Sequence, residues 1–122
     1  MLAVTRFRIP ASESGAFLRE ARAALAVLSG RPGWRSGEIG RAVDDPELWA
    51  ISTRWDNVGS YRRALSAHDV KMAAVPLLSR AIDEPTAFEL LTESDETAHA
   101  ADAGTVGVGE AAAPAIRTDL TR

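Results

Sequence analysis

The sequence contains no cysteine, so disulfide bonds, thiolate metal sites and thiol nucleophiles are excluded. It also lacks a long hydrophobic run. The most apolar stretch, around residues 21–28, is far shorter than the roughly 20 apolar residues that a membrane-spanning helix needs. The first residues are typical of a strand and do not have the basic head and apolar middle of a secretion signal. These absences predict a cytoplasmic protein without a membrane partner.

Basic residues are not in excess either. The chain of 122 residues has 14 Lys and Arg against 17 Asp and Glu, and its pI is about 5.4. A nucleic-acid-binding domain usually has a clustered basic surface and a high pI. We therefore expect no nucleic-acid partner.

The composition changes after residue 92. Residues 93–122 contain no Phe, Tyr or Trp, and they hold 2 basic and 6 acidic residues, against 12 and 11 in residues 1–92. Such a segment buries too little apolar surface to offset the roughly 1–2 kcal/mol of backbone entropy per ordered residue. The sequence therefore predicts one folded domain at 1–92 and a flexible acidic tail at 93–122.

Residue patterns in the first half of this domain predict a strand, a helix and a hairpin. Residues 2–9 are strand-like, and helical spacing continues from a cap at Ser12 to Leu28. The helix is expected to end at 29–33, with Gly30 in the left-handed conformation. Residues 34–43 and 47–55 are typical of two strands joined by a short polar turn.

The second half predicts a helical region and a last strand. Asp56 or Asn57 can cap the helix, and Ser66 with Asp69 resembles a capping box that restarts it. The expected apolar stripe is Tyr61, Leu65, His68, Met72 and Val75. Pro76 interrupts the helix, and residues 86–91 form the last predicted strand.

The order β-α-β-β-α-β predicts an α+β, ferredoxin-like fold, in which two helices cover one face of a four-stranded antiparallel sheet. Alternate side chains of a strand point to opposite faces. The face under the helices is expected to carry Phe7, Ile9, Ile39, Val43, Trp49, Ile51, Trp55, Phe88 and Leu90. The opposite face is expected to carry Val4, Arg6, Arg8, Trp34, Glu38, Leu48, Ala50, Arg54, Glu89 and Leu91.

A face that mixes apolar groups with both signs of charge suits a second copy of the chain. We therefore predict a homodimer through the sheet, with an interface made by Arg6, Trp34, Glu38, Leu48, Arg54 and Glu89. Arg54 can pair with Glu89 or Glu38 to fix the register of the two copies. The alternative is a solvated face with ion pairs inside one chain.

Residues 3–91 resemble the antibiotic biosynthesis monooxygenase family. The likeness is carried by Val-Thr-Arg-Phe at 4–7, Arg-Pro-Gly-Trp at 31–34, the run Thr-Arg-Trp-Asp-Asn-Val-Gly-Ser-Tyr-Arg-Arg-Ala-Leu at 53–65, and Thr-Ala-Phe-Glu at 86–89. The resemblance implies a domain that dimerises face to face through its sheet, as a dimeric α/β barrel. The family includes oxygenases that attack anthrone or quinol rings without metal or flavin, and haem-degrading enzymes.

The resemblance to the haem-degrading members does not extend to the positions that hold haem. Those positions fall on Ala64 and Ala74, and the first strand offers Thr5 where those enzymes have Asn. Alanine cannot present a lone pair to iron, so haem binding would require His68 to substitute from a different turn. We therefore expect no cofactor and no metal.

For a cofactor-free oxygenase, the family resemblance implies a pocket between the helices and the sheet. His68 is the candidate catalytic base, because imidazole takes up a proton near neutral pH. The candidate substrate-binding residues are Thr5, Phe7, Trp49, Thr53, Trp55, Tyr61 and Met72. In the alternative interpretation His68 is a surface or cap residue and the aromatic residues fill the core. The chain would then be a non-catalytic dimeric domain that binds a small ligand or serves in assembly.

Overall fold

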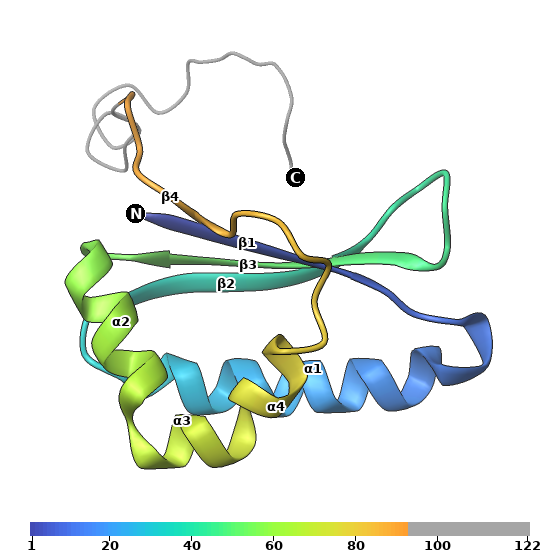
Figure 1. Cartoon of the computed structure of the whole chain (residues 1–122), viewed down its shortest axis with the longest axis horizontal. Helices are drawn as coiled ribbons and strands as arrows, with labels where there is room; N and C mark the ends of the chain where they lie inside the picture. The colour runs from blue at the N-terminus through green and yellow to red at the C-terminus, as the bar shows by residue number, and fades with distance from the viewer. Residues whose placement is uncertain (93–122) are drawn as a thin grey trace. The chain divides into compact units, whose positions relative to one another are not determined.

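The computed structural model describes residues 1–92 (Figure 1); the tail predicted at 93–122 lies outside the described residues. The elements are β1 (Leu2–Arg8), η1 (Ala11–Glu13), α1 (Ser14–Ser29), β2 (Trp34–Arg41), β3 (Leu48–Trp55), α2 (Val58–Ser66), α3 (His68–Ala73), α4 (Val75–Leu78) and β4 (Ala87–Phe88). None of the helices in residues 1–92 combines the length and the apolar character needed to cross a membrane.

The four strands form one antiparallel sheet in the order β2-β3-β1-β4. Helices α1 to α4 all lie on one face of this sheet, and the other face is open (Figure 1). This arrangement confirms the predicted α+β ferredoxin-like fold. The last strand is shorter than expected, because only Ala87–Phe88 pairs with β1.

The start of α1 and the turn after it differ from expectation. Ser12 lies within η1, and no side chain caps α1. Gly30 has φ of −87°, whereas Gly33 has a positive φ of 90°. A side chain at Gly33 would collide with Ser60. The turn therefore needs glycine at position 33, where it packs directly on the first turn of α2.

The helical region that follows β3 begins as predicted but restarts differently. The Asn57 side-chain oxygen accepts a hydrogen bond from the Ser60 amide at 2.9 Å and caps α2. The expected capping box is absent: the Ser66 hydroxyl donates to the Arg62 carbonyl, and Ala67 precedes α3 in an extended conformation with no side-chain cap. The helical region after β3, here called the roof, therefore consists of three short helices, α2, α3 and α4.

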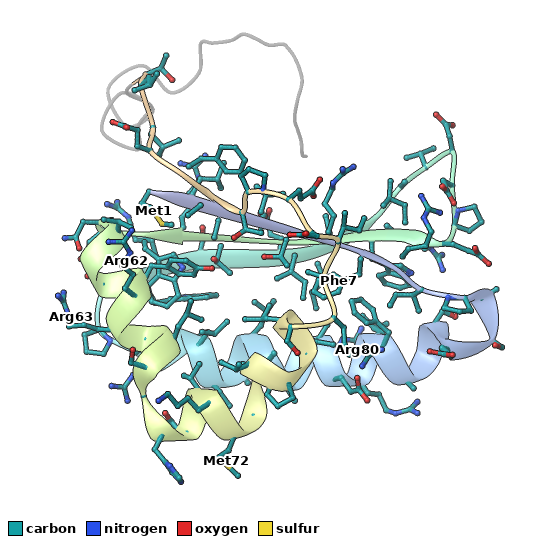
Figure 2. All side chains as sticks on the ribbon, viewed as in Figure 1. Met1, Phe7, Arg62, Arg63, Met72 and Arg80 are labelled. Carbon is teal, nitrogen blue, oxygen red and sulfur yellow. The ribbon has the colours of Figure 1, made fainter. Side chains whose placement is uncertain are left out.

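The helix-covered face of the sheet carries the core, as alternation along β1 and β3 predicted. The largest fully buried side chains in the described part of the chain are Trp55, Phe7, Phe17 and Val70. Figure 2 shows Phe7 between the sheet and α1. The Phe7 and Phe17 rings lie 5.0 Å apart, and the Trp49 ring lies 5.2 Å from Phe17.

Several residues of the sheet region do not lie where alternation placed them. A bulge between Trp34 and Ser36 turns the Trp34 ring to the helix side, where it lies 5.5 Å from Trp55, so Trp34 is not on the open face. Val43 is 98% exposed, because β2 ends at Arg41. Phe88 pairs with Leu2 and lies on the open face rather than in the core.

The other predicted interface residues lie at or near the open face. Arg6, Glu38, Leu48 and Arg54 occupy open-face positions in the register of β1, β2 and β3. Glu89 and Leu90 follow β4 and are exposed, so Leu90 does not enter the core as expected. Within residues 1–92 Arg54 makes no ion pair, and the Glu38 carboxylate accepts only a long hydrogen bond of 3.4 Å from Ser52.

Candidate active site

A pocket of about 240 Å³ opens between the sheet and the broken helical roof. Its walls come from β1, from α2 and α4, and from the segment that leads into β4. The residues that line it are Thr5, Tyr61, Leu65, Val75, Leu78, Ser79, Ala81 and Thr86. The pocket is mostly aliphatic, as small-molecule sites usually are.

The polar groups of this pocket are all hydroxyls. Thr5 is 7% exposed and points its side chain from β1 to the helix side. The Ser79 hydroxyl donates to the Pro76 carbonyl at 2.9 Å. The Tyr61 phenol and the Thr86 hydroxyl both line the pocket, where α2 meets the segment before β4. No carboxylate, imidazole or cation is among the described residues that line the pocket.

Burial dominates the electrostatics of Tyr61. It raises the pKa of the Tyr61 phenol above its ordinary value, and the hydrogen bond from Thr86 offsets part of this rise. The phenol is therefore neutral at physiological pH and can both donate and accept a hydrogen bond. A neutral hydroxyl pair in an aliphatic pocket is suited to hold an oxygen atom of an uncharged ligand.

The first turn of α2 positions Tyr61. Asn57 caps this helix, and its carbonyl accepts a hydrogen bond from the Tyr61 amide at 3.3 Å. The Tyr61 ring lies 5.7 Å from the Trp55 ring, which anchors it against the core. The cap on α2 and the contact with the Trp55 ring therefore both hold the Tyr61 side chain in position.

The pocket exists because the helical roof is interrupted. Ala67 is extended, with ψ of 143°, and separates α2 from α3. Ala74 separates α3 from α4, which has Pro76 in its first turn. Because proline lacks an amide hydrogen and its ring clashes with the preceding turn, a continuous helix cannot pass this point. The pocket lies beside these breaks, with Thr5 on the sheet side and residues of α2 and α4 on the helix side.

Two of the predicted substrate-binding residues, Thr5 and Tyr61, line the pocket. Four others, namely Phe7, Trp49, Thr53 and Trp55, are buried but are not among the pocket-lining residues. Thr53 accepts a hydrogen bond from the Trp55 indole at 2.8 Å, so its hydroxyl is already engaged inside the core. These four side chains belong to the packed interior and not to the pocket wall.

The prediction that His68 and Met72 point inward is wrong. Both side chains are exposed, Met72 by 68%, and Figure 2 shows Met72 directed away from the sheet. The reason is the break at Ala67, which rotates α3 so that Val70 and Ala74 face the core. His68 therefore does not reach the pocket and is not placed to act as its base.

Part of the pocket wall was not predicted from the sequence. Leu65 and Val75 were on the predicted helical stripe, but they were not assigned to a site. Leu78, Ser79, Ala81 and Thr86 were missed altogether, because they lie where the periodic pattern ends. The start of a predicted strand at Thr86, directly after Pro85, was the one signal that pointed to this wall.

Residues 1–74 match the antibiotic biosynthesis monooxygenase family. The chain belongs to this family. This monooxygenase-family chain also resembles solved structures, all at identities that show the fold alone. SnoaB, a cofactor-independent oxygenase from Streptomyces nogalater, has 22% identity and a TM-score of 0.59, over 75% of this chain and 96% of SnoaB.

Two further structures extend the likeness beyond Streptomyces. A protein from Deinococcus radiodurans has 18% identity and a TM-score of 0.63, over 77% of this chain and 95% of that chain. A conserved protein from Methanosarcina mazei has 17% identity and a TM-score of 0.59, over 70% and 84% of the two chains. No curated protein was found to match the monooxygenase-family chain.

Proposed function

We propose that the chain is a cofactor-independent monooxygenase that oxidises a small aromatic or polyketide-type phenol or quinol with O₂. Family membership and the fold shared with SnoaB supply the reaction class. The observation that carries the proposal is that Tyr61 and Thr86 both present a hydroxyl in a mostly aliphatic pocket. The pair receives the phenolic oxygen of the substrate, and the aliphatic walls receive its ring.

The proposed reaction needs little from the protein beyond a dry, shaped cavity. A phenol that loses its proton can give an electron to O₂, and one oxygen atom then bonds to a ring carbon. The hydrogens of that carbon and of the hydroxyl leave with the second oxygen atom as water, and a quinone remains. Aliphatic walls protect the intermediates from water, while Tyr61 and Thr86 orient the ring.

The base in this proposal is not an imidazole. His68 is exposed, and the described pocket residues offer only hydroxyls. The substrate proton therefore passes to solvent at the pocket mouth, and the substrate's own acidity controls the rate. Among a set of substituted anthrones and quinols, the pH at which the rate rises should follow the pKa of the substrate.

Oxygen consumption tests the proposal. With an anthrone or naphthohydroquinone as substrate, Tyr61→Phe should lower kcat/KM by about tenfold, as expected when a buried hydrogen bond to the reacting oxygen is lost. His68→Ala is the matched control and should leave kcat/KM unchanged. No oxygen uptake with any phenol, or equal rates for Tyr61→Phe and the natural chain, would contradict the proposal.

A second candidate function is favoured by the absence of an acid–base pair in the described pocket wall. In this case the chain binds a small uncharged phenol without turning it over. The Trp55 ring touches Tyr61, so quenching of tryptophan fluorescence would report binding. Saturable quenching without oxygen uptake would support the binding domain over the enzyme.

We also propose that two copies pair through the open face of the sheet. Ala50 lies near the middle of this face, where it pairs with Arg6 of β1 and Gly40 of β2. On the same face, Arg54 makes no ion pair within residues 1–92, and Glu38 is held only by a long hydrogen bond from Ser52. A two-fold interface brings each residue of one copy against the matching surface of the other. Both signs of charge are then available for pairing across the interface.

The pairing can be tested by size-exclusion chromatography with light scattering. Ala50→Asp places a charge at the centre of the open face and should convert a dimer into a monomer. Val43→Asp is the control, because Val43 is apolar and 98% exposed but lies in the loop after β2. A monomer for the natural chain at micromolar concentration would contradict this proposal.

A further inference from the structure

Residues 82–86, here called the strap, connect α4 to β4 and run beside β1. Two backbone hydrogen bonds fasten the strap. The Ile82 amide donates to the Arg6 carbonyl at 2.8 Å, and the Val4 amide donates to the Thr86 carbonyl, also at 2.8 Å. The strap thus continues the sheet edge where β4 itself is only two residues long.

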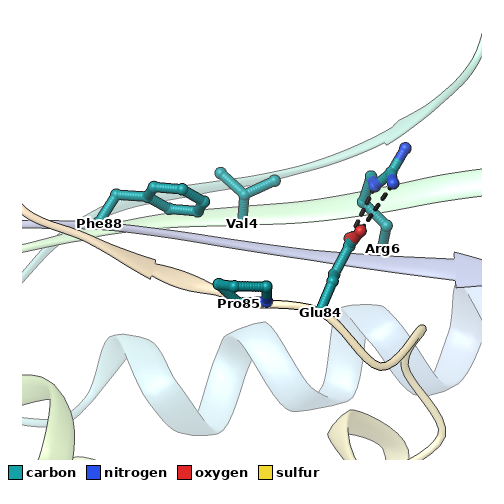
Figure 3. A pocket seen from close by; sticks show the side chains of 5 residues that line it. All are labelled: Val4, Arg6, Glu84, Pro85 and Phe88. Atoms are coloured by element: carbon teal, nitrogen blue, oxygen red, sulfur yellow. Dashed lines mark hydrogen bonds and ion pairs between the residues drawn. The ribbon is translucent and has the colours of Figure 1, made fainter.

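Between these two hydrogen bonds, the strap is held by an ion pair on the open face. Arg6 donates from Nε to Oε2 of Glu84 at 2.8 Å and from a terminal nitrogen to Oε1 at 2.7 Å (Figure 3). Two parallel hydrogen bonds fix the orientation of both planar groups, unlike a single contact between flexible side chains. Glu84 is therefore held in one place relative to β1.

The strap also forms a wall of two different hollows. On the helix side, Thr86 lines the candidate active site beside Tyr61. On the open side, Glu84 and Pro85 line a hollow of about 310 Å³ together with Val4, Arg6 and Phe88 (Figure 3). A change on the open face that moves the strap therefore also changes the pocket on the helix side.

We propose that Arg6 and Glu84 are positioning residues for the active site: by fixing the strap from the open face, they set the Thr86 hydroxyl against Tyr61. Neither residue touches the pocket, so they act only through the strap. The inference rests on the proposed function, since it assumes that the Tyr61–Thr86 pair receives the ligand. The affinity of the pocket for its ligand then depends on the Arg6–Glu84 ion pair on the opposite face of the sheet.

The same strand provides a matched control. Arg8 lies two residues after Arg6, also on the open face, and pairs with Asp45 at 3.0 Å. Both ion pairs are partly exposed and both begin on β1. Asp45, however, lies in the loop between β2 and β3 and not in the strap. Loss of the Arg8–Asp45 pair should therefore leave the pocket unchanged.

The experiment compares Glu84→Gln with Asp45→Asn in the full chain. The first readout is amide hydrogen exchange at Ile82, which should be several-fold faster in Glu84→Gln and unchanged in Asp45→Asn. The second is the ring resonance of Tyr61, the chain's single tyrosine, which should shift only in Glu84→Gln. The third is the Kd of 1-naphthol without oxygen, which should rise about two- to fivefold, the size expected for loss of an exposed ion pair.

The reversed pair Arg6→Glu with Glu84→Arg should restore all three readouts, because it rebuilds the ion pair between β1 and the strap. Binding of 1-naphthol by the natural chain with equal Kd in Glu84→Gln would overturn the inference alone. No binding by the natural chain would defeat the proposed function. In that case the amide exchange of Ile82 and the ring resonance of Tyr61 decide. If neither changes in Glu84→Gln, the role of the ion pair in fixing the strap is wrong. If both change, that role stands.

Discussion

The helix-covered face of the sheet has a filled end and a hollow end. At the filled end, Phe7 meets Phe17, and Phe17 meets Trp49, with ring centroids 5.0 and 5.2 Å apart. At the hollow end, the helix-side position of β1 is occupied by Thr5, two residues before Phe7. The space above Thr5 forms the pocket. Both ends are made by the same strand, so the difference comes from side-chain size and from the roof.

The helices that cover the two ends also differ, because one is continuous and the others are short. The helix that packs on the filled end through Phe17 is α1, which runs unbroken from Ser14 to Ser29. Over the hollow end lie α2 and α4, separated by α3 and by breaks at Ala67 and Ala74. A continuous helix can present a full apolar stripe, whereas short helices leave gaps at their ends. Stability is therefore expected to reside at the filled end and ligand binding at the hollow end.

Phe17→Ala should produce the largest effect, because it removes a fully buried ring from the filled end. The free energy of unfolding should fall by about 3–5 kcal/mol, through lost burial and the cavity left behind. Leu65→Ala at the hollow end removes a half-buried side chain and should lower it by less than about 2 kcal/mol. Urea unfolding measures both, and equal losses would contradict the division between the two ends.

Ala81→Leu should have the next largest effect, and on binding rather than on stability. The added carbons enter the pocket at the hollow end, so the Kd of 1-naphthol should rise more than tenfold. The melting temperature should change little, because the pocket has room for the new side chain. Ala73→Leu, at an exposed position of α3, is the control and should bind normally. Unchanged affinity in Ala81→Leu would show that the ligand lies elsewhere.

The filled end was largely predictable from the sequence, and the hollow end was not. Strands β1 and β3 pair over their whole length without a bulge, so strict alternation placed Phe7, Trp49 and Ile51 correctly. Trp34 was misplaced because a bulge changes the register of β2. Gly37 leaves the space that the Trp34 ring then occupies, since a side chain there would overlap it.

At the hollow end, only Thr5 and Tyr61 were predictable, because both lie within regular elements. The wall from Leu78 to Thr86 has no apolar period, so periodicity does not show which of its side chains face inward. His68 and Met72 were misplaced for a related reason: one extended residue, Ala67, changes the phase of every helical position after it. A pocket made by breaks in regular structure is least visible to reasoning from periodicity.

Asn57→Ala tests how the roof of the hollow end is held, and a moderate effect is expected. Loss of the cap on α2 should lower the free energy of unfolding by about 1 kcal/mol and should weaken ligand binding, because Tyr61 lies in the first turns of this helix. Asn57→Asp keeps a capping oxygen and should stay close to the natural chain. If both variants lose stability equally, the cap is not the cause.

The smallest effect, a dependence of stability on alkaline pH, reports whether the hollow end is dry. Burial raises the pKa of Tyr61 above its ordinary value of 10.0. Above about pH 10 the unfolded chain therefore loses this proton first, while the folded chain retains it. The free energy of unfolding should consequently decline as the pH rises through the folded-state pKa, and it should be unaffected by this group below pH 10.

Tyr61→Phe removes this contribution and leaves every other ionisable group in place, so the difference between the two proteins isolates it. Urea unfolding from pH 8 to 11 should give curves that run parallel up to about pH 10 and then converge, as the natural chain loses the advantage of its neutral phenol. Parallel curves over the whole range would mean that Tyr61 is hydrated in the folded state. The pocket would then lack the desolvation that separates it from an ordinary surface groove, and the two ends of the sheet would differ in packing but not in polarity.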